Sequence, residues 1–481
     1  MKKLLNILII SLLLISCTPK QNELVILSVN DMHSHIEMMP KLAYIADSLR
    51  NIYPELLIVS AGDNRTGNAY NDKYPERPNF PMINLMNEIG FEVSALGNHE
   101  FDGNIDGIRF VLQNANFPLV CSNAFFTGYP DIQLPDYVTI TKKIGGKDLK
   151  IFLLGTIETS NDGKPSAHVK NLQNMDFVPA EDMIAKYLYL RNNCDVFILL
   201  SHCGLTDELL FAEQYPQFDM IIGGHSHDLY TKLFDNGVLY TQSKYYLKFA
   251  TVTKLKIKGG KVIGKEAQVI DLNKVNKVDE KIQALVDMYY NEPDFNTVIG
   301  HAKSPFADKN ALGAFMADAV RYATKADIAM QNPGGVRYDS MHGGDITKAD
   351  VYNLDPFNNS LVICDMTGKQ VEDYLVLASN NDHNSTHVSG ITYTIEYVQS
   401  DDGQSGFVSA KAYLENGKRI KHDKIYKVAI NSYMALWAKE LCLNMEDTGI
   451  YANDAEFLYL KDHQDIDYKD VNRYELTIIN E

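Results

Sequence analysis

The stretch ALGNHEFD (residues 95–102) starts as an apolar run and ends in an amide, an imidazole and two carboxylates. Such a run predicts a buried strand, and the polar residues follow directly after it. Open α/β sheets place their binding sites just beyond the carboxyl ends of their strands. We therefore expect Asn98, His99 and Asp102 to lie in a functional site.

The same theme recurs through the first half of the chain. Six apolar segments end abruptly in polar residues: LVILSVNDMHSH (24–35), LLIVSAGDN (56–64), FEVSALGNHEFD (91–102), IFLLGTIE (151–158), DVFILLSHCG (195–204) and FDMIIGGHSH (218–227). Continuous apolar runs predict strands that are covered on both faces. Intervening segments such as PKLAYIADSLRNIYP (40–54) and AEDMIAKYLYLRNN (180–193) have the spacing of amphipathic helices. The fold class expected is α/β (α+β).

A chain of 481 residues favours two or three domains. The pattern changes near Asp271, where the charged stretch NKVNKVDEKIQALVDMYYNEPD predicts a joining helix. We expect a first domain over residues 24–270, a linker helix within 271–300, and a second α/β domain over 301–481.

The first residues, MKKLLNILIISLLLISC, combine two lysines, a short apolar run and a small residue before Cys17. This pattern predicts a secretion signal over residues 1–16 that is too short to span a membrane comfortably. Its end resembles the bacterial lipobox, which implies lipidation of Cys17 and a tether over 17–23; the alternative is an ordinary signal peptide with a coincidental cysteine. We expect a protein held by a lipid anchor in the bacterial cell envelope, outside the cytoplasm.

The net charge of −17 argues against a nucleic-acid scaffold as partner, although a small phosphate ester could still bind locally. The chain has six cysteines with no CxxC spacing, so neither a disulfide framework nor a zinc knuckle is expected. We expect them mostly to be small buried apolar residues.

The strand ends of the first domain supply oxygen and nitrogen ligands without thiolates. These are Asp31, His33, Asp63, Asn98, His202, His225 and His227. A single histidine of this kind would more often be a hydrogen-bonded structural residue, but the whole set suits divalent Zn, Mn, Co or Fe. Two ions about 3.5–4 Å apart need a bridging ligand, and the Asp63 carboxylate is the obvious candidate.

The order Asp-x-His, Gly-Asp, Gly-Asn-His-Glu, Ser-His and Gly-His-x-His closely resembles the calcineurin-like metallophosphoesterase superfamily, and NHEFD (98–102) resembles its secreted 5'-nucleotidases. The resemblance implies two packed sheets flanked by helices, followed by a substrate-binding domain. It also implies one metal site formed by Asp31, His33, Asp63 and His227, and another formed by Asp63, Asn98, His202 and His225. His99 would contact the phosphate and be oriented by Asp102, whereas His35 and Glu100 would not be ligands.

In the second domain, MQNPGGVRYDS resembles the family's substrate motif, which implies that Asn332 and Arg337 face the substrate. DVYNLDPFNNSLV resembles the segment whose phenylalanine, here Phe357, stacks on the base. Two departures weaken the match. Asp308 and Ala311 lie where the family usually has Arg and Asn, and NSYMALWAKELC (431–442) replaces a glycine-rich loop, leaving Tyr433 or Trp437 to stack instead.

The resemblance therefore implies a dimetal 5'-nucleotidase that releases phosphate from nucleoside monophosphates. The same centre acting as a UDP-sugar hydrolase or 2',3'-cyclic nucleotide phosphodiesterase is an alternative. A surface binding lipoprotein without turnover is a second alternative.

Overall fold

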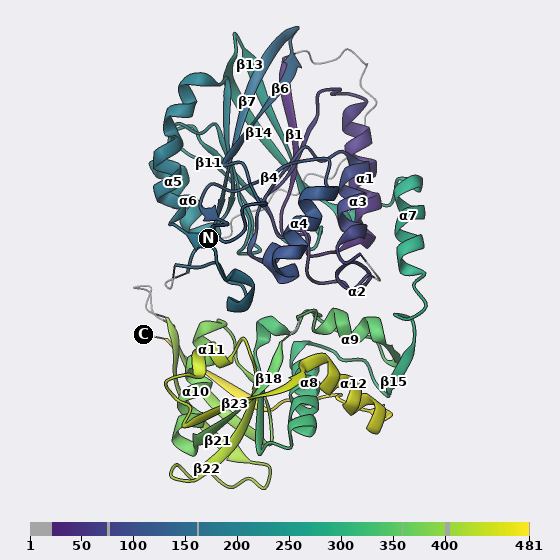
Figure 1. The fold of residues 1–481 in the computed structure, drawn as a ribbon, viewed down its shortest axis with the longest axis vertical. Helices are drawn as coiled ribbons and strands as arrows, with labels where there is room; N and C mark the ends of the chain where they lie inside the picture. The colour runs from purple at the N-terminus through teal and green to yellow at the C-terminus, as the bar shows by residue number, and fades with distance from the viewer. Residues whose placement is uncertain (1–21, 75–76, 161–162, 358, 400–404, 481) are drawn as a thin grey trace.

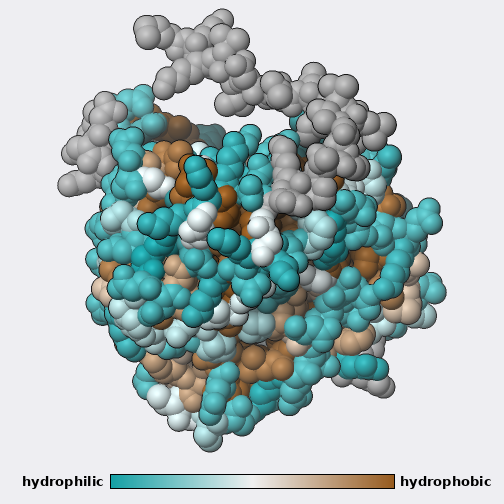
Figure 2. Space-filling view, turned by 90° about the horizontal axis from the view of Figure 1, so that it is seen from above, coloured by the Kyte–Doolittle hydropathy of each residue, from teal (hydrophilic) through white to brown (hydrophobic). Residues whose placement is uncertain are grey.

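The computed structural model describes residues 22–74, 77–160, 163–357, 359–399 and 405–480. The signal segment 1–16, the lipidation site Cys17 and most of the tether lie outside these residues. Within the described ranges, no helix is long and apolar enough to cross a bilayer. Figure 2 shows one face of the molecule, on which hydrophilic residues predominate and hydrophobic residues form small groups.

The N-terminal half contains two six-stranded mixed sheets. The first has the order β14 (Lys261–Asp271), β13 (Phe249–Lys258), β1 (Glu23–Val29), β2 (Leu57–Ser60), β3 (Val93–Ala95) and β4 (Leu119–Val120). The second has the order β11 (Leu229–Leu233), β12 (Leu239–Ser243), β10 (Met220–Ile222), β9 (Val196–His202), β7 (Lys147–Ile157) and β6 (Tyr137–Ile144). Strands form in all six apolar segments, as the sequence predicted.

The two sheets pack face to face, and helices cover their outer faces (Figure 1). Against the first sheet pack α1 (Met39–Arg50), α3 (Phe80–Ile89), α4 (Asn104–Asn114) and α7 (Glu280–Tyr290). Against the second pack α5 (Ala180–Tyr187) and α6 (Leu205–Gln214). The expected two-sheet sandwich flanked by helices is confirmed.

Strand β1 illustrates why the apolar runs are continuous. Leu24 and Ile26 belong to the core between the sheets, whereas Val25 and Leu27 pack towards the helices. Successive side chains in a strand point to opposite faces, so both faces of this strand need apolar residues.

The C-terminal half is also α/β, as expected. Its central sheet has the order β19 (His387–Ser389), β16 (Ile328–Gln331), β22 (Ile425–Asn431), β18 (Ser360–Thr367) and β23 (Asn444–Tyr451). Two three-stranded sheets flank it: β17 (Gly344–Thr347), β15 (Val298–Ala302) and β24 (Asp465–Ile466), and β21 (Gly406–Leu414), β20 (Ile391–Gln399) and β25 (Tyr474–Asn480). The helices are α8 (Lys309–Thr324), α9 (Lys348–Leu354), α10 (Gly368–Asn381), α11 (Ala435–Ala438) and α12 (Ala452–Asp462).

All five cysteines of the described part of the chain are free thiols. Cys121, Cys203 and Cys364 are buried, and Cys194 and Cys442 are partly buried. They therefore act mostly as small apolar residues, as expected.

Helix α7 lies in the segment expected to join the domains, and it packs on the first sandwich layer. Tyr289 is 1% exposed, contacts the rings of Tyr74 and Phe80, and accepts a hydrogen bond from Asn84 (2.8 Å). The next residue towards the N-terminus, Met288, is 53% exposed. The helix is thus anchored by one face to the N-terminal half.

We expect Tyr289→Ala to lower the free energy of unfolding by about 3–5 kcal/mol, because it removes a buried aromatic ring. Met288→Ala, its matched control, should change it by less than about 0.5 kcal/mol. Urea denaturation followed by circular dichroism measures both, and equal midpoints for the two variants would contradict the anchoring role of α7.

Candidate metal centre and substrate cavity

The seven predicted ligands meet at the carboxyl ends of neighbouring strands. Asp31 and His33 follow β1, Asp63 follows β2, and Asn98 begins the 3-10 helix η2 (Asn98–Gly103) after β3. His202 ends β9, and His225 and His227 follow β10. Because the two sheets pack face to face, these ends lie together although they come from distant parts of the chain.

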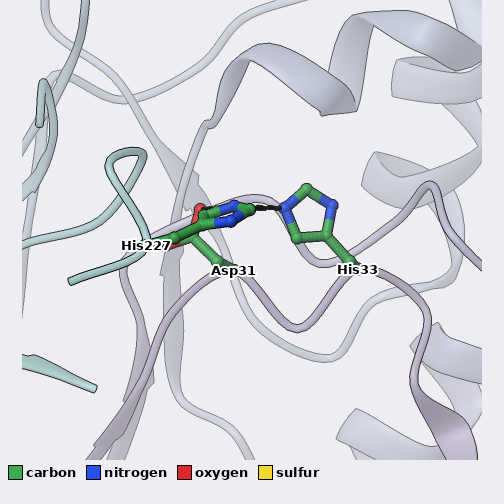
Figure 3. Close-up of side chains that lie close together, drawn as sticks. All are labelled: Asp31, His33 and His227. Atoms are coloured by element: carbon green, nitrogen blue, oxygen red, sulfur yellow. Dashed lines mark hydrogen bonds and ion pairs between the residues drawn. The ribbon is translucent and has the colours of Figure 1, made fainter. Parts of the chain in front are cut away.

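Three overlapping groups of side chains have ligand atoms within 4.8 Å of one another. Asp31, His33 and His227 form one group, shown in Figure 3. Asp63, His202 and His225 form another, and His33, Asp63 and His99 form the third. Nε2 of His33 lies 2.9 Å from Nε2 of His227, and Nε2 of His202 lies 3.1 Å from Oδ2 of Asp63.

The histidine tautomers fit a metal at this centre. His33 and His202 each direct Nδ1 at a backbone carbonyl, that of Thr66 at 3.0 Å and that of Ala61 at 2.7 Å. This arrangement is typical of metal-binding histidines and leaves Nε2 to face the ion. Nε2 of His202 is buried and, although it lies 3.1 Å from Oδ2 of Asp63, it makes no well-directed hydrogen bond among the described residues. The residues present therefore suit a divalent metal.

The backbone at the site is strained. Five candidate ligands have φ in the left-handed region: Asp31 (49°), His33 (46°), Asp63 (53°), His225 (73°) and His227 (62°). This conformation is uncommon for residues other than glycine and clusters at functional sites. The surrounding structure must hold these loops against the local preference of the chain.

Burial and the close packing of charged groups shift the pKa values of the candidate ligands. Burial lowers the pKa of His202, but the carboxylates of Asp63 and Asp31 outweigh it and raise the value to about 10. Burial and the neighbouring His202 lower the pKa of His225 to about 4. Burial raises the pKa of Asp63, yet the nearby His202 and His99 hold it well below its usual range.

Asn98 and His99 lie beside these groups. Oδ1 of Asn98 is 2.9 Å from Nδ1 of His225, and the backbone N–H of His99 donates to Oδ1 of Asp63 (2.8 Å). Nδ1 of His99 pairs with Oδ2 of Asp102 at 2.7 Å. Burial lowers the pKa of His99, but Asp63 and Asp102 outweigh it and raise the value.

The close approach of Asp63 requires Gly97. A Cβ at this position would lie 2.2 Å from Oδ1 of Asp63 and 2.5 Å from its backbone nitrogen. Any larger residue would push the carboxylate away from the other ligands.

Three buried carboxylates hold the ligand loops through backbone N–H groups. Glu100 accepts from Asp63, Asn64 and Gly97 at 2.7–3.0 Å. Its structural role, expected from the sequence, accords with these bonds.

Glu208 and Asp72 play similar parts that sequence reasoning missed. Glu208 accepts from the N–H of Cys203 (2.9 Å) and of Gly224 (3.3 Å), the residues next to His202 and His225. Burial, only partly offset by hydrogen bonds such as that from the Tyr240 hydroxyl, raises the pKa of Glu208 to about 7. Asp72 accepts from the N–H groups of residues 66–68 at 2.7–3.0 Å. Nothing in the sequence distinguishes either carboxylate from an exposed one.

One cavity of about 680 Å³ joins the metal centre to the C-terminal domain. Asn98, His99, Asp102 and His225 line it from one side, and the predicted substrate residues Asn332, Arg337 and Phe357 line it from the other. Arg337 reaches across the domains, so that its Nη2 lies 3.2 Å from Nδ1 of His33. Asn332 is almost buried and accepts a hydrogen bond from Asn431 (2.9 Å).

The two departures from the expected substrate motif have different outcomes. Asp308 caps helix α8 by accepting from the N–H groups of Asn310 and Ala311, and neither Asp308 nor Ala311 lines the cavity. Tyr433 does line it. Trp437 contacts the Tyr433 ring edge-on at 5.0 Å and is not a lining residue. His35 lies outside the three ligand groups.

Comparison with known proteins agrees with this architecture. Residues 24–229 match the family model for calcineurin-like phosphoesterases, and residues 298–440 match the model for the 5'-nucleotidase C-terminal domain. The 5'-nucleotidase of Vibrio cholerae is 25% identical over 87% of this chain and 84% of its own length. The trifunctional nucleotide phosphoesterase YfkN of Bacillus subtilis is 24% identical over 86% of this chain, which spans 32% of that protein.

Among solved structures, the 5'-nucleotidase precursor from Thermus thermophilus superimposes with a TM-score of 0.81. The alignment covers 94% of this chain and 99% of that one at 22% identity, which shows a shared fold. The two domain matches, in this order and on this fold, show that the chain belongs to the 5'-nucleotidase family, with a calcineurin-like metallophosphoesterase domain and the family's C-terminal domain.

Proposed function

We propose that the chain is a dimetal phosphoric ester hydrolase, a 5'-nucleotidase that releases phosphate from nucleoside monophosphates outside the cytoplasm. In this proposal the protein is a lipoprotein of the bacterial cell envelope, anchored through Cys17. Its family and the names of its relatives support a nucleotide substrate.

One observation carries the proposal: a single cavity brings the metal-ligand groups and the predicted substrate residues together. Its volume of about 680 Å³ lies within the range of small-molecule sites. The candidate ligands Asn98 and His225, together with His99 and Asp102, line it opposite the predicted substrate residues Asn332, Arg337 and Phe357. An ester bound there would have its phosphate near the metal ligands and its remaining part against the C-terminal domain.

We assign Asp31, His33, Asp63 and His227 to one ion, and Asp63, Asn98, His202 and His225 to the other. Their imidazole, carboxylate and amide groups suit Zn, Mn, Co or Fe. Such ions, when bound, lower the pKa of a coordinated water and orient a phosphate for in-line attack. The bridging position suits Asp63, because its Oδ2 lies 3.1 Å from Nε2 of His202 and 3.8 Å from Nε2 of His33, one proposed ligand of each ion.

His99 is the proposed stabiliser of the phosphoryl oxygens. Asp102 fixes its ring through Nδ1, so Nε2 remains to donate to the ester. The raised pKa of His99 favours the charged imidazolium, which stabilises negative charge developing on the phosphate.

In the C-terminal half, Arg337 offers a planar fork that can pair with phosphate oxygens. Phe357 lies 6.1 Å from the His99 ring, centroid to centroid, and so borders the phosphate end of the cavity. Its ring can support a nucleobase or ribose, while Tyr433 lines the same cavity.

A broader set of nucleotide esters is the second candidate. Tyr451, which is 52% exposed, and Asp447 also line the cavity. The relative YfkN is named a trifunctional nucleotide phosphoesterase. These observations favour testing UDP-sugars and 2',3'-cyclic nucleotides as well.

Phosphate release from AMP, UMP, UDP-glucose, 2',3'-cyclic AMP and p-nitrophenyl phosphate tests the proposal. The protein is first stripped with a chelator and then supplied with Mn²⁺ or Zn²⁺. We expect activity to disappear on chelation, to return with metal, and to be highest with a nucleoside monophosphate. No hydrolysis of any ester with either metal would overturn the enzyme proposal.

Asp63→Ala and His99→Ala should separate metal binding from turnover. Asp63→Ala should lose both bound metal and activity, because both ion sites share this carboxylate. His99→Ala should retain metal and lower kcat by about 10²–10³-fold, the usual effect of removing one such donor. Metal content by mass spectrometry and steady-state kinetics measure both, with Asp47→Ala, a 56% exposed carboxylate, as control. Equal metal loss in the two variants would refute the role of His99.

Phe357→Ala should raise KM for nucleotides about 5- to 150-fold, because base stacking contributes about 1–3 kcal/mol. It should leave KM for p-nitrophenyl phosphate nearly unchanged. Phe125→Ala, which alters a 37% exposed ring, is the matched control. A similar change in KM for both substrates would exclude stacking on Phe357.

A further inference from the structure

The loop over residues 244–247, between β12 and β13, is strained although it contains no glycine. Lys244, Tyr246 and Leu247 have φ values of 67°, 58° and 49°. Each left-handed residue of this kind costs about 1–2 kcal/mol. Three left-handed residues within four positions indicate that the surrounding structure holds this loop in a strained conformation, as is common at functional sites.

The loop is tied to the metal centre. The backbone N–H of Tyr246 donates to the carbonyl of Asp31 (2.7 Å), and the side chain of Asn30 donates to the carbonyl of Lys244 (2.7 Å). The Tyr246 ring stacks on His35 at 4.1 Å and meets the edge of His33 at 5.5 Å. Its position is therefore set by the residues on both sides of the ligand Asp31.

Tyr246 also reaches the other domain. The guanidinium carbon of Arg337 lies 5.8 Å from the centre of the Tyr246 ring and 5.7 Å from that of Phe357. Arg337 thus contacts one aromatic ring from each domain, and both distances lie within the range of cation–π attraction.

Arg337 is held by these rings rather than by acidic groups. Among the described residues it forms no ion pair with a carboxylate, and its neighbour Asp339 lies near Lys248 (3.5 Å) and Lys309 (3.8 Å) instead. Nε of Arg337 is buried without a hydrogen-bond partner within the same residues. Aromatic contacts orient a guanidinium without occupying its N–H donors. Nη2 lies 3.2 Å from Nδ1 of His33, and the unpaired Nε–H remains for an anion.

We infer that Tyr246 is a positioning residue: with Phe357 it holds the Arg337 guanidinium over His33, directed at the phosphate of the bound ester. The inference rests on the proposed function, since that function places a phosphate beside His33. In this inference Tyr246, a residue of the N-terminal domain, helps Arg337 of the C-terminal domain to bind phosphate. Arg337 is correctly placed only when both domains contribute their ring.

Binding of inorganic phosphate to the metal-loaded protein, measured by calorimetry, is the principal test. Tyr246→Ala should weaken this binding about 3- to 30-fold, the effect of losing a partly desolvated cation–π contact. It should also raise KM for the ester while changing kcat little. Tyr246→Phe should restore both values, because the ring and not the hydroxyl contacts Arg337.

A double-mutant cycle tests whether Tyr246 acts through Arg337. The combined variant Tyr246→Ala/Arg337→Ala should bind phosphate no more weakly than Arg337→Ala alone, because the two side chains form one unit. Tyr189→Ala, which alters a 56% exposed ring, should behave as the wild type. The inference would be overturned if the double variant bound phosphate more weakly than Arg337→Ala by the factor that Tyr246→Ala alone produces. It would also be overturned if Tyr246→Ala bound phosphate normally or lost its metal.

This result is separable from the proposed function. If the wild-type protein hydrolyses no ester, the proposed function is refuted. The phosphate affinities of the wild type and of Tyr246→Ala can still be compared, and they test the role of Tyr246. Conversely, an active enzyme whose Tyr246→Ala variant binds phosphate normally refutes only the positioning role.

Discussion

The site depends on hydrogen bonds from backbone N–H groups to three buried carboxylates. Glu100 ties the loop of Asp63 to the turn before Asn98, and Glu208 ties the loop of His202 to that of His225. Asp72 does the same for residues 66–68, whose first carbonyl meets His33. A buried carboxylate is stable only when its oxygens are satisfied, so each anion and its loops hold one another in place.

These bonds restrain part of the strained backbone at the ligands, since Glu100 accepts from Asp63 itself and Glu208 from the residue before His225. Left-handed backbone at Asp31, His33, Asp63, His225 and His227 would relax in an isolated loop. Here the loops are anchored at the ends of strands buried in a two-sheet sandwich. The carboxylates accept hydrogen bonds from backbone N–H groups of these loops. The result is a concentration of imidazoles and carboxylates. Burial and the neighbouring His202 lower the pKa of His225, whereas Asp63 and Asp31 outweigh burial and raise the pKa of His202. A divalent cation bound among these groups would offset the mutual repulsion of the ligands.

The second domain completes the cavity. Its residues meet the metal centre through Arg337, whose guanidinium lies beside His33, and through Phe357, which borders His99. The rings on either side of Arg337 come from different domains. The contact between the two domains thus passes through Arg337, the residue proposed to bind the phosphate.

The residue pattern alone was sufficient to predict the six buried strands, the α/β class and the polar side chains at the strand ends, and the family resemblance added the two-sheet sandwich. These features depend on local chemistry: two-sided burial needs continuous apolar runs, and strand ends expose polar side chains at one edge. Glu208, Asp72 and Tyr246 could not be recognised in this way, because their partners are distant in the chain and an ordinary surface residue has the same local pattern. Likewise, only the folded chain brings Arg337 to His33 across 304 residues and decides that Tyr433, not Trp437, lines the cavity. Long-range packing sets such approaches, and no short stretch of sequence encodes them.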